Sequence, residues 1–195
     1  MRTLAACVVV ASLAVALPAA AQEPKKTEPA AVPAAMPMPK PGPEHQLLAD
    51  EAGTWDAKVE IFMAPGAAPM VSSGVEVNTL GCGGLCLITD FKGEMGPGAT
   101  FHGHGTAVWD PAKKKYVGTW TDSMSSGISI GESTYDAAKK VSTGWMEGAD
   151  HTGKMVKHKS TVEYKGDQRV FSMFSVAPDG KETLGMRITY TRRKS

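Results

Sequence analysis

The stretch Trp55-Asp-Ala-Lys-Val-Glu-Ile-Phe-Met63 decides the expected fold of this chain. Apolar residues occupy its odd positions, and the charged residues Asp56, Lys58 and Glu60 alternate with them. Successive side chains of a β-strand point to opposite faces, so a two-residue period is typical of a strand with one buried face. The stretch therefore predicts a half-buried strand.

Nine further segments follow the same pattern, and Gly, Pro and Asp mark turns between them. Ten short strands in series favour an antiparallel meander, and closing the meander into a barrel leaves no unpaired edge strand. A barrel of this size has room for a small ligand wherever side chains do not fill it. The nine expected ranges are residues 70–80, 85–94, 99–109, 116–122, 128–135, 141–146, 155–164, 168–177 and 184–192.

One short helix is expected before the first strand. Pro43 suits the first turn of a helix, and Gly53 suits its end. Between them, Leu47 and Leu48 lie on one side. The fold class is therefore all-β, a closed antiparallel meander of about ten strands with one short N-terminal helix.

The first 21 residues have the features of a secretory signal peptide. One cation, Arg2, precedes an apolar run, and small residues lead up to Gln22. This arrangement predicts cleavage after Ala21 and a periplasmic or secreted protein, with no transmembrane segment in the mature chain.

Residues 22–43 form an expected Pro/Ala-rich spacer, which holds 7 of the 13 Pro. Proline fixes φ and removes amide donors, so such a segment stays extended and packs no core. All 13 Phe, Trp and Tyr follow Pro43, which makes residues 44–195 the barrel domain. A spacer of this kind can present the domain to a partner in the cell envelope.

The charge balance excludes one class of partner. The chain has 21 Lys and Arg against 20 Asp and Glu, and cleavage removes only Arg2. A balance so close to zero argues against nucleic-acid binding, which needs a basic surface.

Gly53-Thr-Trp55, after a short helix, resembles the signature of the lipocalin-like (calycin) barrels. The resemblance implies that an Arg near the last strand stacks across Trp55 and closes one end of the barrel, and Arg192 is the candidate. Longer stretches resemble the bacterial family called domain of unknown function 1579, which offers no established activity or catalytic residue to carry over. These stretches are Pro41–His45, Lys114–Tyr116, Trp120–Ile128, Thr134–Asp136, Asp179–Glu182 and Tyr190–Arg192.

Cys82 and Cys86, which depart from that family's pattern, are the cysteines left after cleavage. They flank Gly83-Gly-Leu85, so a hairpin with a three-residue loop places them opposite each other, near the Cα separation of roughly 5.5 Å that a disulfide needs. In an oxidising compartment we expect a disulfide that holds the hairpin tip rigid. A redox-active pair is the less favoured alternative.

His102 and His104 also depart from the pattern. Two residues apart in an expected strand, their imidazoles point to one face about 7 Å apart. That spacing suits zinc or copper, or one histidine as a haem ligand, provided a third ligand comes from another strand. Phe101, Ala107 and Trp109 mark the opposite face as the core, which favours a solvent-facing pair without a ligand.

Trp120, Asp122 and Met124 are the candidate ligand-binding residues. Asp122 is in register with Tyr116 and Trp120 at a strand end, so it faces inward at the barrel mouth and suits a cation or a polar ligand head. The open alternative is that Asp122 and Ser123 cap a turn.

Three functions follow, in order of preference. The first is a non-enzymatic exported barrel that binds a small apolar or amphipathic molecule. The second is a metal- or haem-binding protein that uses His102 and His104. The third is an enzyme with Asp122 as acid or base; no catalytic residue and no cofactor is predicted.

Overall fold

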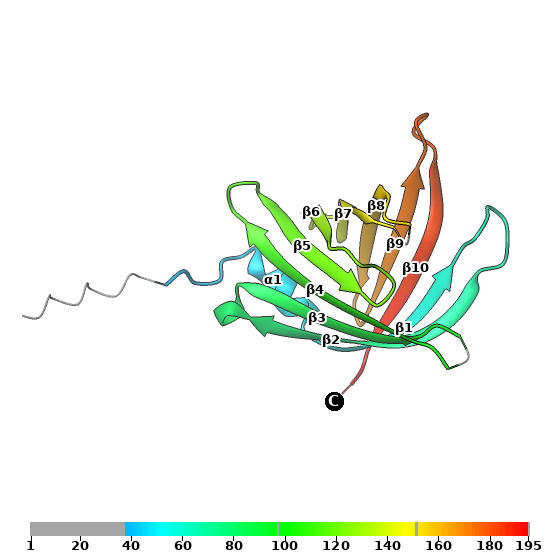
Figure 1. Cartoon of the computed structure of the whole chain (residues 1–195). Coiled ribbons are helices and arrows are strands. Elements are labelled where there is room, and N and C mark those ends of the chain that lie inside the picture. Colours follow the sequence, from blue (N-terminus) through cyan, green and yellow to red (C-terminus); the bar gives the residue numbers. More distant parts are fainter. Residues whose placement is uncertain (1–37, 97, 151, 195) are drawn as a thin grey trace, which may run out of the picture. The chain divides into compact units, whose positions relative to one another are not determined.

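The computed structural model describes residues 38–96, 98–150 and 152–194. Its ten antiparallel strands form one closed barrel, which confirms the expected fold class (Figure 1). The elements are α1 (His45–Glu51), β1 (Gly53–Ile61), β2 (Met70–Gly81), a 3₁₀ turn (Cys82–Gly84), β3 (Cys86–Glu94), β4 (Thr100–Asp110), β5 (Lys115–Asp122), β6 (Ser129–Asp136), β7 (Val141–Ala149), β8 (Met155–Lys165), β9 (Gln168–Val176) and β10 (Glu182–Arg192).

Each strand pairs with its neighbours in sequence, and β1 pairs with β10 to close the barrel. The register of the closing pair sets Trp55 opposite Arg192. The expected strands agree with the observed ones except at their ends, and β7 runs to Ala149, three residues further than predicted. The predicted helix is shorter, because the backbone becomes extended at Ala52 (φ −62°, ψ 140°).

The predicted signal peptide and residues 22–37 of the predicted spacer lie outside the described residues. The last part of the spacer lies against the barrel. Gly84, in the turn after β2, has φ +90° and sits so close to Pro41 that a Cβ would come 2.9 Å from the Pro41 Cγ. No helix in the described ranges is long and apolar enough to span a membrane.

The alternation read from the sequence divides the strands into an inner and an outer face. On β1, Trp55, Ala57 and Val59 are buried while Asp56 and Lys58 are exposed. We call the space that the inner faces enclose the lumen. The core begins at one end of the lumen, where Trp55 and Tyr190 lie, and continues along it with Ala57, Val59, Phe91 and Ile188.

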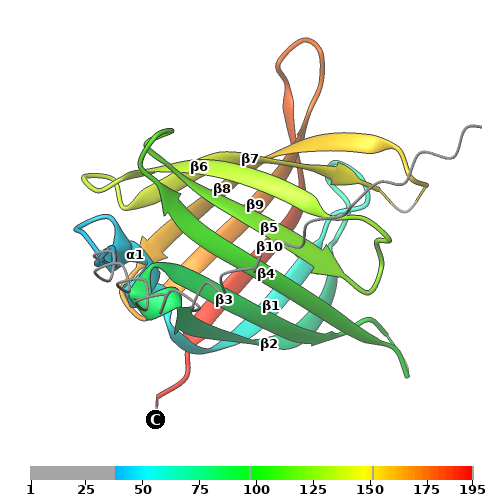
Figure 2. The same ribbon diagram turned by 60° about the vertical axis from the view of Figure 1, so that its left-hand side comes forward.

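Helix α1 lies across that end of the barrel, which we call the closed end (Figure 2). Its Leu48 is buried. A seven-residue helix leaves its last carbonyls without helical partners, and barrel side chains satisfy them here. Trp55 Nε1 and Asn78 Nδ2 donate to the Glu51 carbonyl at 2.9 and 3.1 Å, and Arg192 Nη1 donates to the Ala52 carbonyl at 2.7 Å.

The opposite end, the open end, is formed by the loops β1–β2, β3–β4, β5–β6, β7–β8 and β9–β10. Ile61 and Met70 face inward there and pair with each other, yet 39% and 64% of their surfaces remain exposed. The first three loops contain no charged residue. They and the start of β2 carry four exposed methionines, the methionine rim: Met63, Met70, Met95 and Met124.

Candidate functional site

The lumen has two chemically different walls. Strands β3–β5 contribute aromatic side chains, with the Phe91 and Phe101 ring centroids 5.8 Å apart. Toward the open end, strands β6–β8 contribute mostly small and polar inward residues, which are Ser129, Gly131, Ser133, Gly144, Met146, Gly148, His158 and Ser160. Toward the closed end, the same strands carry the inward rings of Tyr135 and Tyr164, whose centroids lie 5.6 Å apart.

Glycines let the Trp120 and Phe91 rings lie against the barrel wall. A Cβ at Gly103 would come 2.2 Å from the Trp120 ring, and one at Gly74 would come 2.4 Å from the Phe91 ring. Real Cβ atoms do not approach so closely, so these strands carry the rings only because Gly stands at both positions. The rings therefore cover the wall rather than cross the lumen.

The inner side chains are not completely buried. Even Trp55, at the closed end, keeps 3% of its surface exposed. Trp120, Met146, Phe171 and Met173 face inward further up the barrel and are only partly buried. A close-packed core hides such residues from water, so these inner side chains are covered less completely than those of such a core.

Asp122 faces inward, as expected, and it also caps a turn. It pairs with Gly103 on the inner face near the open end, where its Oδ2 accepts from Trp120 Nε1 at 3.0 Å. Its Oδ1 accepts from the Met124 backbone N–H at 2.8 Å, which caps the turn. Met124 itself is 58% exposed in the loop, so the structure brings Trp120 and Asp122 together and leaves Met124 on the rim.

His158 is an inward-facing residue that sequence reasoning missed. It lies on β8 opposite Met146 of β7 and Ser175 of β9. Its Nδ1 atom is buried and has no hydrogen-bond partner within the described ranges. The alternation along β8 could have predicted that His158 faces inward. That its Nδ1 lacks a hydrogen-bond partner depends on the neighbouring strands.

The closed end holds a buried ion-pair network that sequence reasoning also missed. Arg169 donates to Glu51 of α1 and to Glu76 of β2, and its guanidinium lies 4.5 Å from the Trp55 ring centroid and 4.4 Å from that of Tyr190. Burial disfavours the charged guanidinium, but the two carboxylates outweigh this effect and raise the pKa of Arg169. Arg169 is therefore a fixed cation that joins α1 to the barrel.

Two tyrosines belong to the same network. Tyr164 donates to Glu51 Oε1 at 2.6 Å. Burial, followed by the charge of Glu51, raises the pKa of Tyr164 well above its usual range; burial and Glu76 do the same for Tyr190. Both hydroxyls therefore stay protonated far into alkaline pH.

Arg192 lies over the Trp55 ring, 4.1 Å from its centroid, in the arrangement that the lipocalin-like resemblance implies. The guanidinium also donates to the carbonyls of Asp50 and Ala52 at the end of α1. A cation suits the negative end of a helix dipole. Trp55 and Arg192 thus close the barrel and hold the helix.

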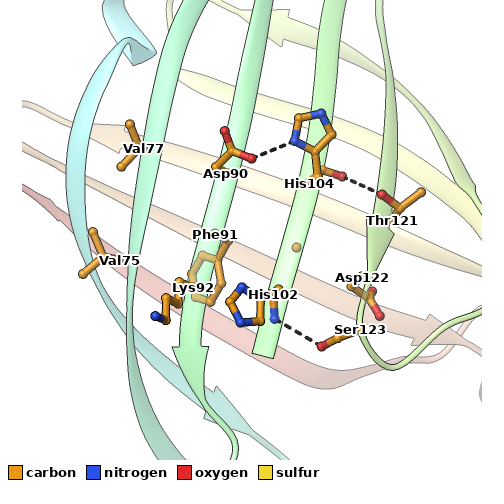
Figure 3. A pocket seen from close by; sticks show the side chains of 11 residues that line it. Val75, Val77, Asp90, Phe91, Lys92, His102, His104, Thr121, Asp122 and Ser123 are labelled. Carbon is orange, nitrogen blue, oxygen red and sulfur yellow. Dashed lines mark hydrogen bonds and ion pairs between the residues drawn. The ribbon is translucent and has the colours of Figure 1, made fainter. Parts of the chain in front are cut away.

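His102 and His104 lie on the outer face of β4, in a groove of about 630 Å³ between β2 and β5 (Figure 3). The two imidazoles share one exposed face, as expected, and His104 Nδ1 lies 2.8 Å from Asp90 Oδ1. No cluster of three or more His, Cys, Asp or Glu within the described ranges is arranged to hold a metal ion. The groove is outside the lumen, so the pair is separate from the aromatic wall.

The expected disulfide between Cys82 and Cys86 is not present, because both residues are free thiols here. Their Sγ atoms lie 2.6 Å apart, further than the roughly 2.05 Å of a disulfide bond. The expected register is also wrong. Cys86 pairs with Gly81, while Cys82 has φ +53° and opens a turn. The hydrogen bond with Cys82, followed by burial, raises the pKa of the Cys86 thiol.

Comparison with solved structures supports the barrel fold. The chain is similar to the crystal structure of Rv2717c from M. tuberculosis, with a TM-score of 0.59 and 14% identity over 78% of this chain and 99% of that one. A redesigned β-barrel gives a TM-score of 0.39 and 13% identity over 77% and 95% of the two chains. At these identities the likeness to Rv2717c concerns the fold alone.

No curated protein matches the sequence. A family model does match, over residues 40–192, and its description is "Protein of unknown function (DUF1579)". The match covers the barrel, α1 and the last residues of the predicted spacer. The chain therefore belongs to the DUF1579 family of proteins of unknown function.

Proposed function

We propose that the protein binds a small apolar or amphipathic molecule in the lumen, without converting it chemically. One observation carries the proposal: the Trp120 and Phe91 rings lie against Gly103 and Gly74, so these two rings of the aromatic wall do not cross the lumen. A guest would contact these rings on one side and the small polar wall of β6–β8 on the other.

The hydrophobic effect supplies the affinity. Partly exposed apolar side chains, among them Trp120 and Phe171, face the lumen. Each 100 Å² of apolar surface that a guest covers contributes about 2.5 kcal/mol before the cost of association. Access is through the open end, since α1 covers the other.

The inward carboxylates support binding rather than catalysis. Both Asp122 oxygens accept hydrogen bonds from within the barrel, and Glu51 and Glu76 pair with Arg169. General acid–base catalysis needs a group free to exchange a proton with the substrate. These carboxylates are committed to structure.

Native mass spectrometry of the protein purified from its own host tests the proposal. We expect a retained small molecule, and after its removal saturable binding of the apolar fluorophore N-phenyl-1-naphthylamine. Protein that carries no guest and binds no fluorophore while folded would overturn the proposal.

We also propose that the protein is exported, on the strength of its signal-like first 21 residues. The exported chain should start at Gln22. A full-length chain retained in the cytoplasm would contradict export.

A weaker second candidate is a metal site on the outer groove, favoured by one contact. Asp90 lies 2.8 Å from His104 Nδ1, and a carboxylate on one ring nitrogen orients the other toward a metal. His104 and His102 would then share a zinc or copper ion with water. Isothermal titration with zinc should show binding that His102→Ala with His104→Ala abolishes; unchanged binding would exclude this site.

A further inference from the structure

His158 stands apart from the other polar groups inside the barrel. It is the one described histidine that faces the lumen, since His102 and His104 face outward and His45 belongs to α1. The charged network of Arg169 lies at the closed end, near the start of β9. Asp122, near the open end, already holds Trp120 and a turn.

The Nδ1 atom of His158 is buried, and no described group forms a hydrogen bond with it. A buried polar atom without a partner costs roughly 1–3 kcal/mol, so such atoms are rare and call for an explanation. The cross-strand neighbours do not supply one. Met146 offers only a weakly accepting thioether, and Ser175 forms no hydrogen bond with the ring.

The residues around His158 make a small polar site on the inner face of β8 and β9. Ser160 follows two residues later on the same face of β8, opposite Met173. Ser175 lies directly across from His158. An imidazole and two hydroxyls are thus placed along one wall, with thioethers of Met146 and Met173 beside them.

This site complements the aromatic wall. A guest whose tail contacts Trp120 and Phe101 presents its other end to the wall made by β6–β8. Because Nδ1 is buried, a head group in the lumen can reach it only when the imidazole ring turns about its Cβ–Cγ bond. A carboxyl or hydroxyl head group can then form hydrogen bonds with the imidazole and the serine hydroxyls, whereas a purely apolar guest cannot.

We propose that His158, with Ser160 and Ser175, binds the hydrogen-bonding head group of an amphipathic ligand whose tail lies on the aromatic wall. The inference rests on the proposed function and sharpens it by naming the ligand class: single-chain amphiphiles with a carboxyl or hydroxyl head.

Displacement of N-phenyl-1-naphthylamine by three competitors with a straight chain of twelve carbons tests the site. 1-Dodecanol and dodecanoic acid carry the head group, and 1-methoxydodecane lacks the proton donor. At least one of the first two should bind about three- to ten-fold more tightly than the ether, the value of one neutral hydrogen bond. The competitor with the larger gain in affinity over the ether shows whether the site prefers a carboxyl or a hydroxyl head.

Three variants assign this preference to His158. His158→Phe should bring the competitors within two-fold of each other, because the phenyl ring keeps bulk and loses both nitrogens. His158→Gln should restore part of the preference and serves if the Phe variant does not fold. His102→Phe, on the outer face of the barrel, is the matched control and should leave the preference unchanged.

The outcomes separate the two proposals. If the fluorophore binds but neither head-group competitor exceeds the ether, or if both His158 variants keep the preference, the head-group site is wrong and ligand binding stands. If folded protein binds neither fluorophore nor competitors, ligand binding in the lumen is wrong, and the head-group site with it.

Discussion

The two ends of the barrel differ in the chemistry of their side chains. At the closed end, buried Arg169 pairs with Glu51 and Glu76, and the carbonyls that end α1 accept hydrogen bonds from barrel side chains. At the open end, three consecutive loops carry no charge and expose the methionine rim. The same ten strands thus end in a buried network of ion pairs and hydrogen bonds on one side and in exposed methionines on the other.

The difference shows how the barrel can be stable although its inner side chains are only partly buried. A short helix is marginal by itself, so its position depends on partners from the barrel. Tyr164 and Arg169, from β8 and β9, supply them across more than a hundred residues of sequence. With the closed end held in this way, the open end needs no network of its own, and the lumen does not have to be filled for the barrel to close.

Removing the cation of the closed end should have the largest effect. Arg169→Met leaves Glu51 and Glu76 without their buried counter-charge, which we expect to lower the free energy of unfolding by about 3–5 kcal/mol. Urea unfolding measures this loss. Arg193→Met is the matched control, since Arg193 pairs with Asp56 on the exposed surface, and it should change stability little. Equal losses in the two variants would contradict a special role for the closed end.

Adding a methyl group to the aromatic wall should have the second largest effect. Gly103→Ala puts a Cβ 2.2 Å from the Trp120 ring and pushes the ring into the lumen, at a cost of about 1–3 kcal/mol and with weaker fluorophore binding. Gly131→Ala, on the opposite wall, meets its nearest atom only at 3.4 Å and should keep both stability and binding. Fluorophore titration of the two variants compares the walls. Undiminished binding by Gly103→Ala would show that the Trp120 ring does not define the lumen.

Alkaline pH should loosen the closed end. The raised pKa of Tyr164 means that the unfolded chain loses this proton near pH 10 while the folded chain keeps it. Stability is therefore fully present below pH 10 and falls as the pH rises toward the folded-state pKa, by up to about 1.4 kcal/mol per pH unit for this tyrosine. Unfolding between pH 8 and 11 should give a shallower fall for Tyr164→Phe, and an unchanged slope would refute the coupling.

The rim should contribute least to stability. Replacing Met63 and Met70 together by Gln removes only exposed side chains, so the free energy of unfolding should change by less than about 0.5 kcal/mol. Peroxide should also oxidise these two residues before the lumen residues Met146 and Met173, as peptide mass spectrometry can follow. A large loss of stability would mean that the rim packs against something in solution.

The architecture could be predicted from the sequence because a half-buried strand alternates apolar and polar residues with a period of two. Alternation around Trp55 and in nine further segments predicted ten strands, and the closing pair Trp55 and Arg192 followed from resemblance. The outward direction of His102 and His104 also followed from alternation.

The site was less accessible to sequence reasoning, because it depends on residues that meet only when the barrel closes. Arg169 lies 118 residues from Glu51 and 93 from Glu76, and no local pattern joins them. From the sequence alone, Gly103 is a residue that weakens a strand. The structure shows that the Trp120 ring leaves no space for a Cβ at this position. The predicted cysteine pairing failed for a similar reason, since a one-residue change in the turn set Cys86 opposite Gly81.

The central claim is that the lumen accepts a guest from the end opposite α1, and methionine-methyl NMR tests it most directly. With ¹³C-methyl methionine, added N-phenyl-1-naphthylamine should shift the signals of the inward residues Met146, Met173 and Met186 and leave Met38, which is 82% exposed before α1, unchanged. Saturable binding that leaves the three inward methyls unshifted would place the guest outside the barrel and contradict the account.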